Sequence, residues 1–165
     1  MFDLTIMEAA EHLLALCARK HLTVATAESC TGGLVAGAIS AISGSSAVLD
    51  RGFVTYSNQA KQQMLGVKPD TLDFYGAVSR QCAEEMAKGV LGHAPVDLAV
   101  SITGIAGPTG GTPDKPVGLV HFAAASRGGV LLTHESRYGD LGRSQVRRLS
   151  VLQALAMLTQ LTDTA

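Results

Sequence analysis

Hydrophobic residues along the chain recur with two different spacings, which separate helices from strands. Between residues 5 and 20 they recur every three or four positions, as on the buried face of an amphipathic helix. Thr5 and Glu8 stand at the spacing of a capping box at the start of this segment. Amphipathic patterns also predict helices over 79–91 and 141–161. In the last of these we expect an inward-facing stripe of Val146, Leu149, Leu152 and Ala156.

Short hydrophobic runs predict strands at 22–27, 51–56 and 96–102, and the first lacks any alternation, as buried strands do. Two longer runs lie on either side of S-R-G-G and predict a β-hairpin. Ser57 and Asn58 are candidate caps for a helix that continues through Leu65, and residues 66–76 form a proline and glycine break. Mixed parallel and antiparallel strands with helices between them predict one three-layer α/β/α domain over residues 1–165, built on a mixed β-sheet.

Composition narrows the function classes. Of the 165 residues, 47% are hydrophobic and 16% are charged, and 13 basic residues face 14 acidic ones. No basic surplus supports binding to nucleic acid or to an anionic membrane surface. The 21 residues from Ser29 to Leu49 carry no charge, but ten of them are Gly, Ser or Thr, so a buried helix and a loop explain them better than a membrane span. The N-terminus carries acids where a secretory signal carries Lys or Arg, so we expect a soluble, cytoplasmic protein.

The motif A-E-S-C-T-G-G places Ser29 where a strand ends and a helix is about to begin. Serine is among the commonest N-cap residues, so a purely structural role is one interpretation. In the other, Ser29 attacks a carbonyl group while the backbone N–H groups of Cys30, Thr31, Gly32 and Gly33 stabilise the oxyanion. Cys30 is a rival nucleophile, because a thiolate is favoured at a helix N-terminus.

A serine nucleophile needs a base, and none of the five histidines lies in a glycine-rich loop. In T-Y-S-N-Q-A-K, Tyr56 ends a strand and Lys61 falls near the first turn of the next helix. The helix dipole favours the neutral amine there, which is the form that accepts a proton, provided that the dipole or burial lowers the pKa of the lysine enough. An ordinary solvated lysine and a tyrosine at the rim of the core are the structural alternatives.

Residues 103–113, T-G-I-A-G-P-T-G-G-T-P, follow a buried strand and, with four glycines and two prolines, are long for a simple connection. A plain glycine-rich turn is the structural alternative. Successive N–H groups in such a loop can hold an anion. Arg143 and Arg147 are four residues apart on one helix face, where an arginine can bind a phosphate or a carboxylate. The three cysteines form no C-x-x-C pair, and no cluster has metal-ligand spacing, so we expect neither a metal nor a cofactor.

These three motifs together resemble the CinA C-terminal domain family. The resemblance runs from about residue 5 to residue 160 and rests on A-E-S-C-T-G-G, Y-S-N-Q-A-K and T-G-I-A-G-P-T-G-G-T-P-D-K-P-V-G. Stand-alone members of the family are bacterial nicotinamide-nucleotide amidases. The resemblance therefore implies a metal-independent serine amidase of pyridine-nucleotide salvage, which converts nicotinamide mononucleotide to nicotinic acid mononucleotide and ammonia. It also implies a homo-oligomer.

Carried over by position, the resemblance makes Ser29 the nucleophile and Lys61 its general base, with Tyr56 hydrogen-bonded in the same site. The residues that it assigns to substrate binding are Cys30, Thr31, Gly32, Gly33, Thr103, Gly104, Gly107, Gly110, Gly111 and Arg143. Many members of the family read G-D-R, whereas Leu141 and Gly142 here separate Asp140 from Arg143. Two alternatives remain open: a non-catalytic, nucleotide-binding module associated with competence, and a cysteine amidase that uses Cys30.

Overall fold

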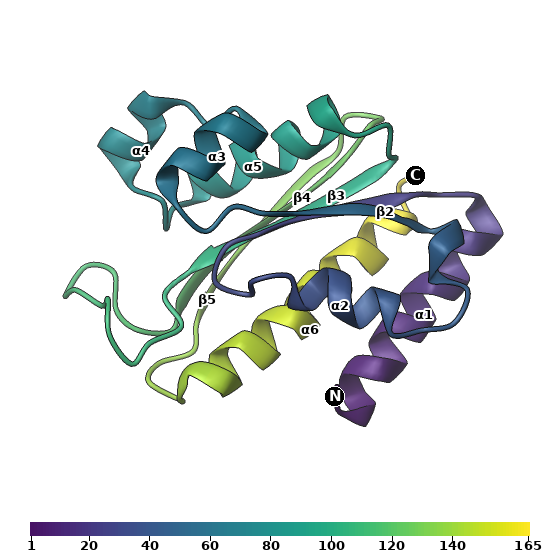
Figure 1. Ribbon diagram of the computed structural model, residues 1–165, viewed down its shortest axis with the longest axis horizontal. Coiled ribbons are helices and arrows are strands. Elements are labelled where there is room, and N and C mark those ends of the chain that lie inside the picture. The colour runs from purple at the N-terminus through teal and green to yellow at the C-terminus, as the bar shows by residue number, and fades with distance from the viewer.

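A mixed sheet separates two layers of helices in the computed structural model, which describes residues 1–165 (Figure 1). The five strands lie in the order β2-β1-β3-β4-β5. β1 is parallel to both β2 and β3, whereas β3, β4 and β5 are antiparallel to one another in turn. Their bounds are Val24–Glu28 (β1), Leu49–Val54 (β2), Leu98–Gly104 (β3), Leu119–Ser126 (β4) and Leu131–Arg137 (β5). The predicted three-layer α/β/α fold, its mixed sheet and its hairpin are confirmed.

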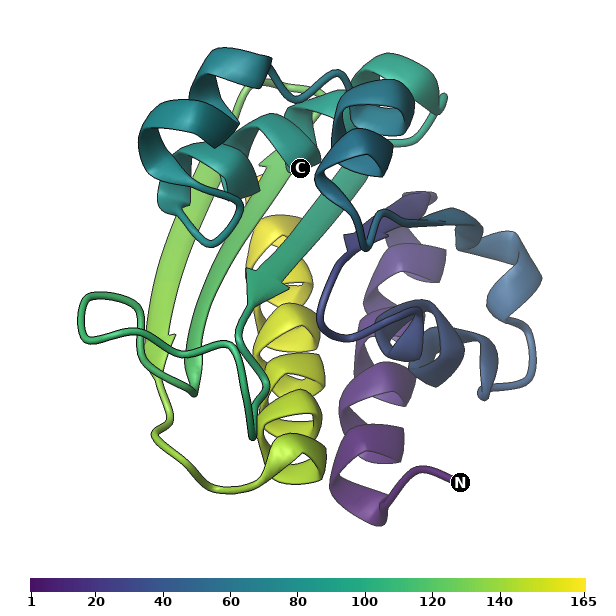
Figure 2. The ribbon, with the colours of Figure 1, turned by 60° about the vertical axis from the view of Figure 1, so that its left-hand side comes forward.

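The helices divide between the two faces of the sheet (Figures 1 and 2). One layer contains α1 (Leu4–Lys20), α2 (Leu34–Ser40) and α6 (Arg143–Thr162), and the other contains α3 (Asn58–Leu65), α4 (Pro69–Tyr75) and α5 (Arg80–His93). A short 3₁₀ turn, η1 (Ser45–Ala47), precedes β2. Successive residues of β3 serve the two layers in turn: Val100 joins the core under α1 and α6, while the hydroxyl of Ser101 donates to the carbonyl of Ala83 in α5. Both faces of β3 are thus buried.

Three details of the helices differ from the sequence predictions. The N-cap of α1 is Asp3, whose carboxylate accepts from the N–H of Ile6, so the predicted capping box of Thr5 and Glu8 is wrong. The break at 66–76 contains α4, because Pro69 occupies the first helical turn, where its missing N–H costs nothing. In α6, Ala156 is exposed. The buried positions of α6 are Val146, Ser150, Val151, Ala154, Leu155, Met157, Leu158, Leu161 and Thr162.

The uncharged stretch from residue 29 to residue 49 forms the turn after β1, helix α2 and η1. None of the helices combines the length and the apolar character that a bilayer crossing requires.

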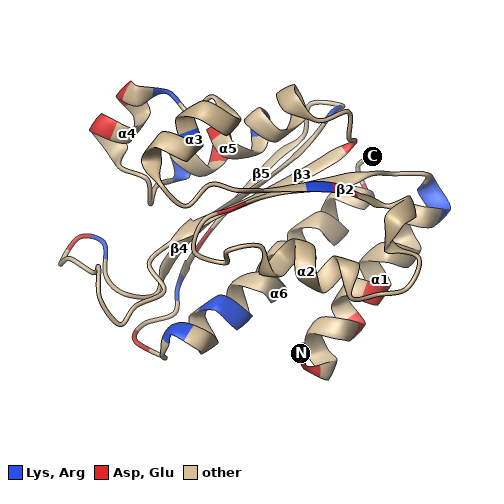
Figure 3. Ribbon diagram, viewed as in Figure 1, with Lys and Arg blue, Asp and Glu red and all other residues tan.

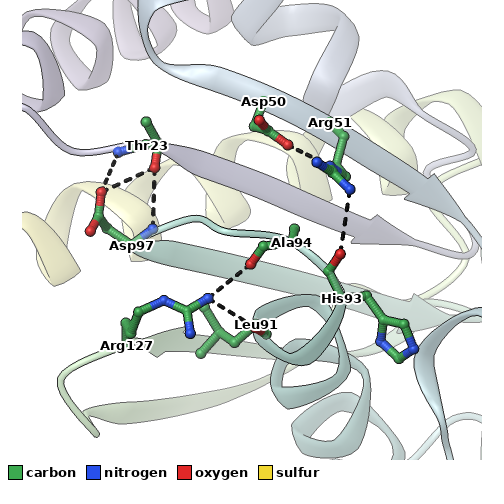
Figure 4. Close-up of polar contacts among 8 residues, drawn as sticks. All are labelled: Thr23, Asp50, Arg51, Leu91, His93, Ala94, Asp97 and Arg127. Atoms are coloured by element: carbon green, nitrogen blue, oxygen red, sulfur yellow. Dashed lines mark hydrogen bonds and ion pairs between the residues drawn. The ribbon is translucent and has the colours of Figure 1, made fainter.

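Polar contacts fasten the end of the sheet at which β1 and β3 begin (Figure 4). The carboxylate of Asp97 accepts from the backbone N–H of Thr23 at 2.8 Å and from its hydroxyl at 3.0 Å. Arg127 donates to the carbonyl oxygens of Leu91 and Ala94, at 2.9 and 2.8 Å. These contacts fix the end of the sheet that lies opposite the carboxyl ends of β1 and β3.

Candidate active site

The carboxyl ends of β2, β1 and β3 lie side by side, and the connections that leave them enclose a cavity of about 270 Å³. Ligands of open α/β sheets bind at this edge of the sheet. The long connection from β3 to β4 projects beyond it, next to the start of α6 (Figure 2). The cavity is lined by Ser29, Cys30, Tyr56, Asn58, Lys61, Ala77, Val78, Thr103, Gly104, Ile105, Ala106, Gly107, Thr109, Gly110 and Arg143.

Ser29 follows β1 directly, and its backbone N–H donates to the carbonyl of Ile102 in β3 at 2.9 Å. Helix α2 begins only at Leu34, and its N-cap position is occupied by Gly33, with a φ of 100° that favours glycine. Ser29 therefore does not cap the helix, which removes the structural interpretation of this serine. Its side chain points toward α3 instead, where it meets Lys61.

Helix α2 is capped by Glu28, a fully buried residue that the sequence analysis did not single out. Its carboxylate accepts from the N–H groups of Val35 and Ala36 at 2.8 and 3.0 Å, and from the hydroxyl of Thr26 at 3.2 Å. These contacts tie the end of β1 to the start of α2 and so fix the turn that carries Ser29. The signal in the sequence was an acid placed directly before a glycine-containing turn that leads into a helix.

This cap changes the expected oxyanion site. The first turn of α2 donates to Glu28, and Gly32 N–H donates to the carbonyl of Ser29 at 3.0 Å. Gly32 is therefore not a donor to a ligand, contrary to expectation. The N–H of Cys30, the residue next to the nucleophile, donates to no group of the protein. Among the residues of this turn whose N–H has no backbone partner, Cys30 alone lines the cavity, so its N–H is the candidate donor for an oxyanion.

Lys61 is the largest fully buried side chain, with only 1% of its surface exposed. Helix α3 presents it to the cavity, and Ser57 caps that helix as predicted, with its hydroxyl oxygen accepting from Ala60 N–H at 3.0 Å. The Nζ atom lies 3.0 Å from Oγ of Ser29, 2.8 Å from the carbonyl oxygen of Thr55 and 3.3 Å from that of Tyr56. Burial lowers the pKa of Lys61.

The three contacts of Lys61 define how a neutral amine sits in the site. A neutral amine has two N–H donors and one lone pair, and the two carbonyl oxygens of Thr55 and Tyr56 have no proton to give. In the charged form Nζ donates to Oγ of Ser29, whereas in the neutral form the N–H bonds go to these carbonyls and the lone pair is left for the hydroxyl of Ser29. This is the arrangement in which an amine removes a proton from a serine.

Tyr56 and Arg143 form a pair on the other side of the cavity. The tyrosine side chain is 58% exposed, and its hydroxyl accepts from Arg143 at 2.8 Å. Arg143 also donates to the carbonyl of Gly107, in the loop after β3, at 2.9 Å. The side chain of Tyr56 thus meets Arg143, while its carbonyl oxygen contacts Lys61. Arg143 joins α6 to the glycine-rich loop at the cavity wall.

Of the other residues predicted to bind substrate, Cys30, Thr103, Gly104, Gly107 and Gly110 line the cavity. The hydroxyl of Thr103 is engaged by the carbonyl of Ala77, at 2.8 Å. Thr31, Gly32, Gly33 and Gly111 do not line it. Asn58 also lines the cavity, one helical turn before Lys61, whereas its place in the sequence indicates only a capping role.

Sequence similarity assigns the chain to a known family. Residues 6–162 match the CinA C-terminal domain. The chain belongs to the CinA C-terminal domain family. It is 50% identical over 161 residues to the nicotinamide-nucleotide amidohydrolase PncC of Escherichia coli (strain K12), a match that covers 97% of the chain and 96% of that relative. A CinA-like protein of Shewanella pealeana is 50% identical over 149 residues, which are 90% of the chain but only 35% of the larger protein.

Solved structures of the family share the fold. The competence/damage inducible protein CihA from Agrobacterium tumefaciens is 54% identical, with a TM-score of 0.97 and 98% of each chain covered. A CinA superfamily protein from Klebsiella pneumoniae is 35% identical, with a TM-score of 0.91 and coverage of 97% of this chain and 99% of that one. The amidohydrolase relatives support an amide-hydrolysing activity for this chain as a member of the family.

Within this fold, the environment of Cys30 disfavours the cysteine mechanism. Its side chain is buried in the apolar core beneath α2 and α6, and burial raises the pKa of its thiol to about 11. A thiol in such surroundings stays protonated at neutral pH and is a weak nucleophile.

No group of three or more His, Cys, Asp or Glu side chains is placed to hold a metal ion.

Proposed function

We propose that this chain hydrolyses the carboxamide of nicotinamide mononucleotide, releasing ammonia and nicotinic acid mononucleotide, with Ser29 as nucleophile and Lys61 as general base. The observation that carries the proposal is the 3.0 Å contact between the Ser29 hydroxyl and a buried amine whose pKa is lowered. The substrate is suggested by the name of the E. coli relative, which is similar to this chain over almost its whole length.

In the first half of the reaction, Ser29 Oγ attacks the carboxamide carbon as Lys61 takes the hydroxyl proton. The tetrahedral intermediate carries its negative charge on the former carbonyl oxygen, next to the N–H of Cys30. One such donor contributes about 3 kcal/mol to lowering the barrier. The Lys61 ammonium then returns its proton to the amide nitrogen, so that ammonia leaves and an acyl-serine remains.

In the second half, water attacks the acyl-serine and Lys61 removes a proton from that water. The ammonium of Lys61 protonates Oγ of Ser29 as the ester breaks, and the carboxylate product is released. A pyridinium ring in the cavity disfavours a second positive charge nearby, which helps to keep Lys61 neutral between steps. In this proposal Arg143 and the loop 105–110 hold the ribose phosphate, since Arg143 supplies a permanent positive charge at the cavity wall.

The test compares wild-type protein with Ser29→Ala in a solution of nicotinamide mononucleotide and EDTA, with released ammonia measured. Ser46→Ala is a matched control, since Ser46 is exposed in η1 and its side chain makes no hydrogen bond. We expect release by the wild type and the control alone. Binding of the nucleotide without release by any of the three would replace the proposal with that of a nucleotide-binding module. Analytical ultracentrifugation tests the accompanying proposal that the protein is a homo-oligomer.

A further inference from the structure

Arg147 lies outside the cavity, yet it binds the turn that carries the nucleophile. It is half-buried on α6, one helical turn after Arg143. Its Nε donates to the carbonyl of Cys30 at 3.1 Å, and one terminal nitrogen donates to the carbonyl of Thr31 at 3.4 Å. The guanidinium packs so closely on the turn that a Cβ at Gly32 would lie 3.5 Å from it.

A chain of peptide groups leads from this guanidinium to the nucleophile. The peptide whose carbonyl belongs to Thr31 has its N–H on Gly32, and that N–H donates to the carbonyl of Ser29 at 3.0 Å. The peptide whose carbonyl belongs to Ser29 has its N–H on Cys30. In a trans peptide the C=O and N–H point in opposite directions, so fixing one end orients the other. The chain of donors therefore ends at the free N–H of Cys30.

A positive charge at the start of such a chain strengthens every donor along it. Hydrogen-bonded groups polarise one another, and the effect is larger in a buried site, where solvent screens little. The carbonyls of Cys30 and Thr31 face the guanidinium, so electron density is drawn toward Arg147 and away from the N–H groups. In the proposed reaction, the Cys30 N–H donates to the substrate oxygen on which negative charge develops.

We propose that Arg147 is a positioning residue for catalysis, which orients and polarises the Cys30 N–H through the Thr31 and Ser29 carbonyls. The inference rests on the proposed function, because it needs Ser29 to be the nucleophile. Blue segments mark basic residues near the start of α6 in Figure 3. The three arginines of this part of the helix then have three tasks. Arg143 faces the cavity, Arg147 holds the nucleophile turn, and Arg148 pairs at the surface with Asp3, the N-cap residue of α1.

The test compares Arg147→Gln and Arg147→Lys with the control Arg148→Gln. Two rates are measured: turnover of nicotinamide mononucleotide, and covalent labelling of Ser29 by a fluorophosphonate, whose phosphoryl oxygen uses the same donor as an oxyanion. In Arg147→Gln we expect kcat and the labelling rate to fall together by about ten- to a hundred-fold, less than the loss of a whole oxyanion donor. KM should change by less than about twofold, since Arg147 does not line the cavity.

Arg147→Lys keeps the charge without the planar fork, so it should recover part of both rates. If Arg147→Gln does not fold, as judged by circular dichroism, Arg147→Lys alone carries the comparison and should still lower kcat more than KM changes. Rates equal to those of Arg148→Gln, or a change confined to KM, would overturn the inference.

The two readouts separate this inference from the proposed function. If wild-type protein is labelled at Ser29 but releases no ammonia from the nucleotide, the proposed substrate is wrong, and the labelling rates still decide the role of Arg147. If Ser29 of the wild type resists labelling, the serine is not activated and the role of Arg147 is refuted with it.

Discussion

Replacing Lys61 with methionine removes the proposed base while keeping a side chain of similar length in the same buried space. A positioned general base contributes about 10²- to 10⁴-fold to a reaction rate, which corresponds to about 3–5 kcal/mol of barrier. The Nζ of Lys61 is within hydrogen-bond distance of Ser29 Oγ, and no histidine lines the cavity to take its place. We therefore expect ammonia release by Lys61→Met to fall by at least a hundred-fold.

The same substitution should leave the protein folded. The carbonyls of Thr55 and Tyr56 each lose one donor, which costs about 1–3 kcal/mol for each group that is left without a partner. Burying a thioether in place of an amine that is costly to desolvate offsets much of this. The change in the free energy of unfolding should therefore stay within about 2 kcal/mol, small enough for the variant to be purified and assayed.

The assay measures ammonia release from nicotinamide mononucleotide, with urea unfolding recorded on the same samples. Lys68→Met is the matched control, since Lys68 is exposed and its side chain makes no hydrogen bond or ion pair. Activity of Lys61→Met within tenfold of that of the control, in a folded protein, would remove Lys61 from the proton path. It would leave the buried amine as a structural residue only.

Three further predictions concern pH and packing. The proposed reaction needs neutral Lys61, whose pKa is lowered, so kcat/KM should rise with pH and level off below pH 10.5. A fall in kcat/KM over pH 7–10 would contradict the role of Lys61 as a base. Burial raises the pKa of Cys82 from 9.0 to about 11, so the unfolded chain loses this proton first. Stability should then fall by up to about 3 kcal/mol for this thiol as pH rises from 9 to 11, and urea unfolding of Cys82→Ala should show a smaller loss. A Cβ at Gly89 in α5 would lie 2.0 Å from the carbonyl oxygen of Leu65. Gly89→Ala should therefore lower the free energy of unfolding by roughly 1–3 kcal/mol or more, which is measured as a lower thermal midpoint. Gly92→Ala, on the same helix with open space around it, should not lower it.

Much of the fold could be predicted from the sequence, because the spacing of hydrophobic residues within each element matches the positions that the fold buries. The strand runs, the hairpin and the helices at both ends follow from hydrophobic spacing. Helix α4 was missed because Pro69 and the neighbouring glycines were interpreted as a break, although proline in the first helical turn also starts helices. In α6 the predicted stripe missed most of the buried positions, because a long helix that packs on both α1 and the sheet buries a wider face. Ala156 lies outside that face and is exposed.

The candidate site was accessible only in part. Ser29 and Lys61 stand in recognisable sequence motifs. They are 32 residues apart, however, and only the tertiary structure shows that they are in contact. Glu28 lies within A-E-S-C-T-G-G, and Arg147 forms the predicted pair with Arg143, but neither pattern identifies the particular groups that these two residues contact. Their partners are backbone N–H and carbonyl groups, which every residue type has, so no pattern of side chains reveals them.

The two members of the Ser29–Lys61 pair approach the sheet edge from opposite sides. Ser29 belongs to the turn that leads into the layer of α1, α2 and α6, whereas Lys61 belongs to α3 in the other layer. A chain in which only one layer has docked therefore lacks the contact between Ser29 and Lys61. In the proposed mechanism the hydroxyl of Ser29 then has no base, so amide hydrolysis requires both layers to be docked on the sheet.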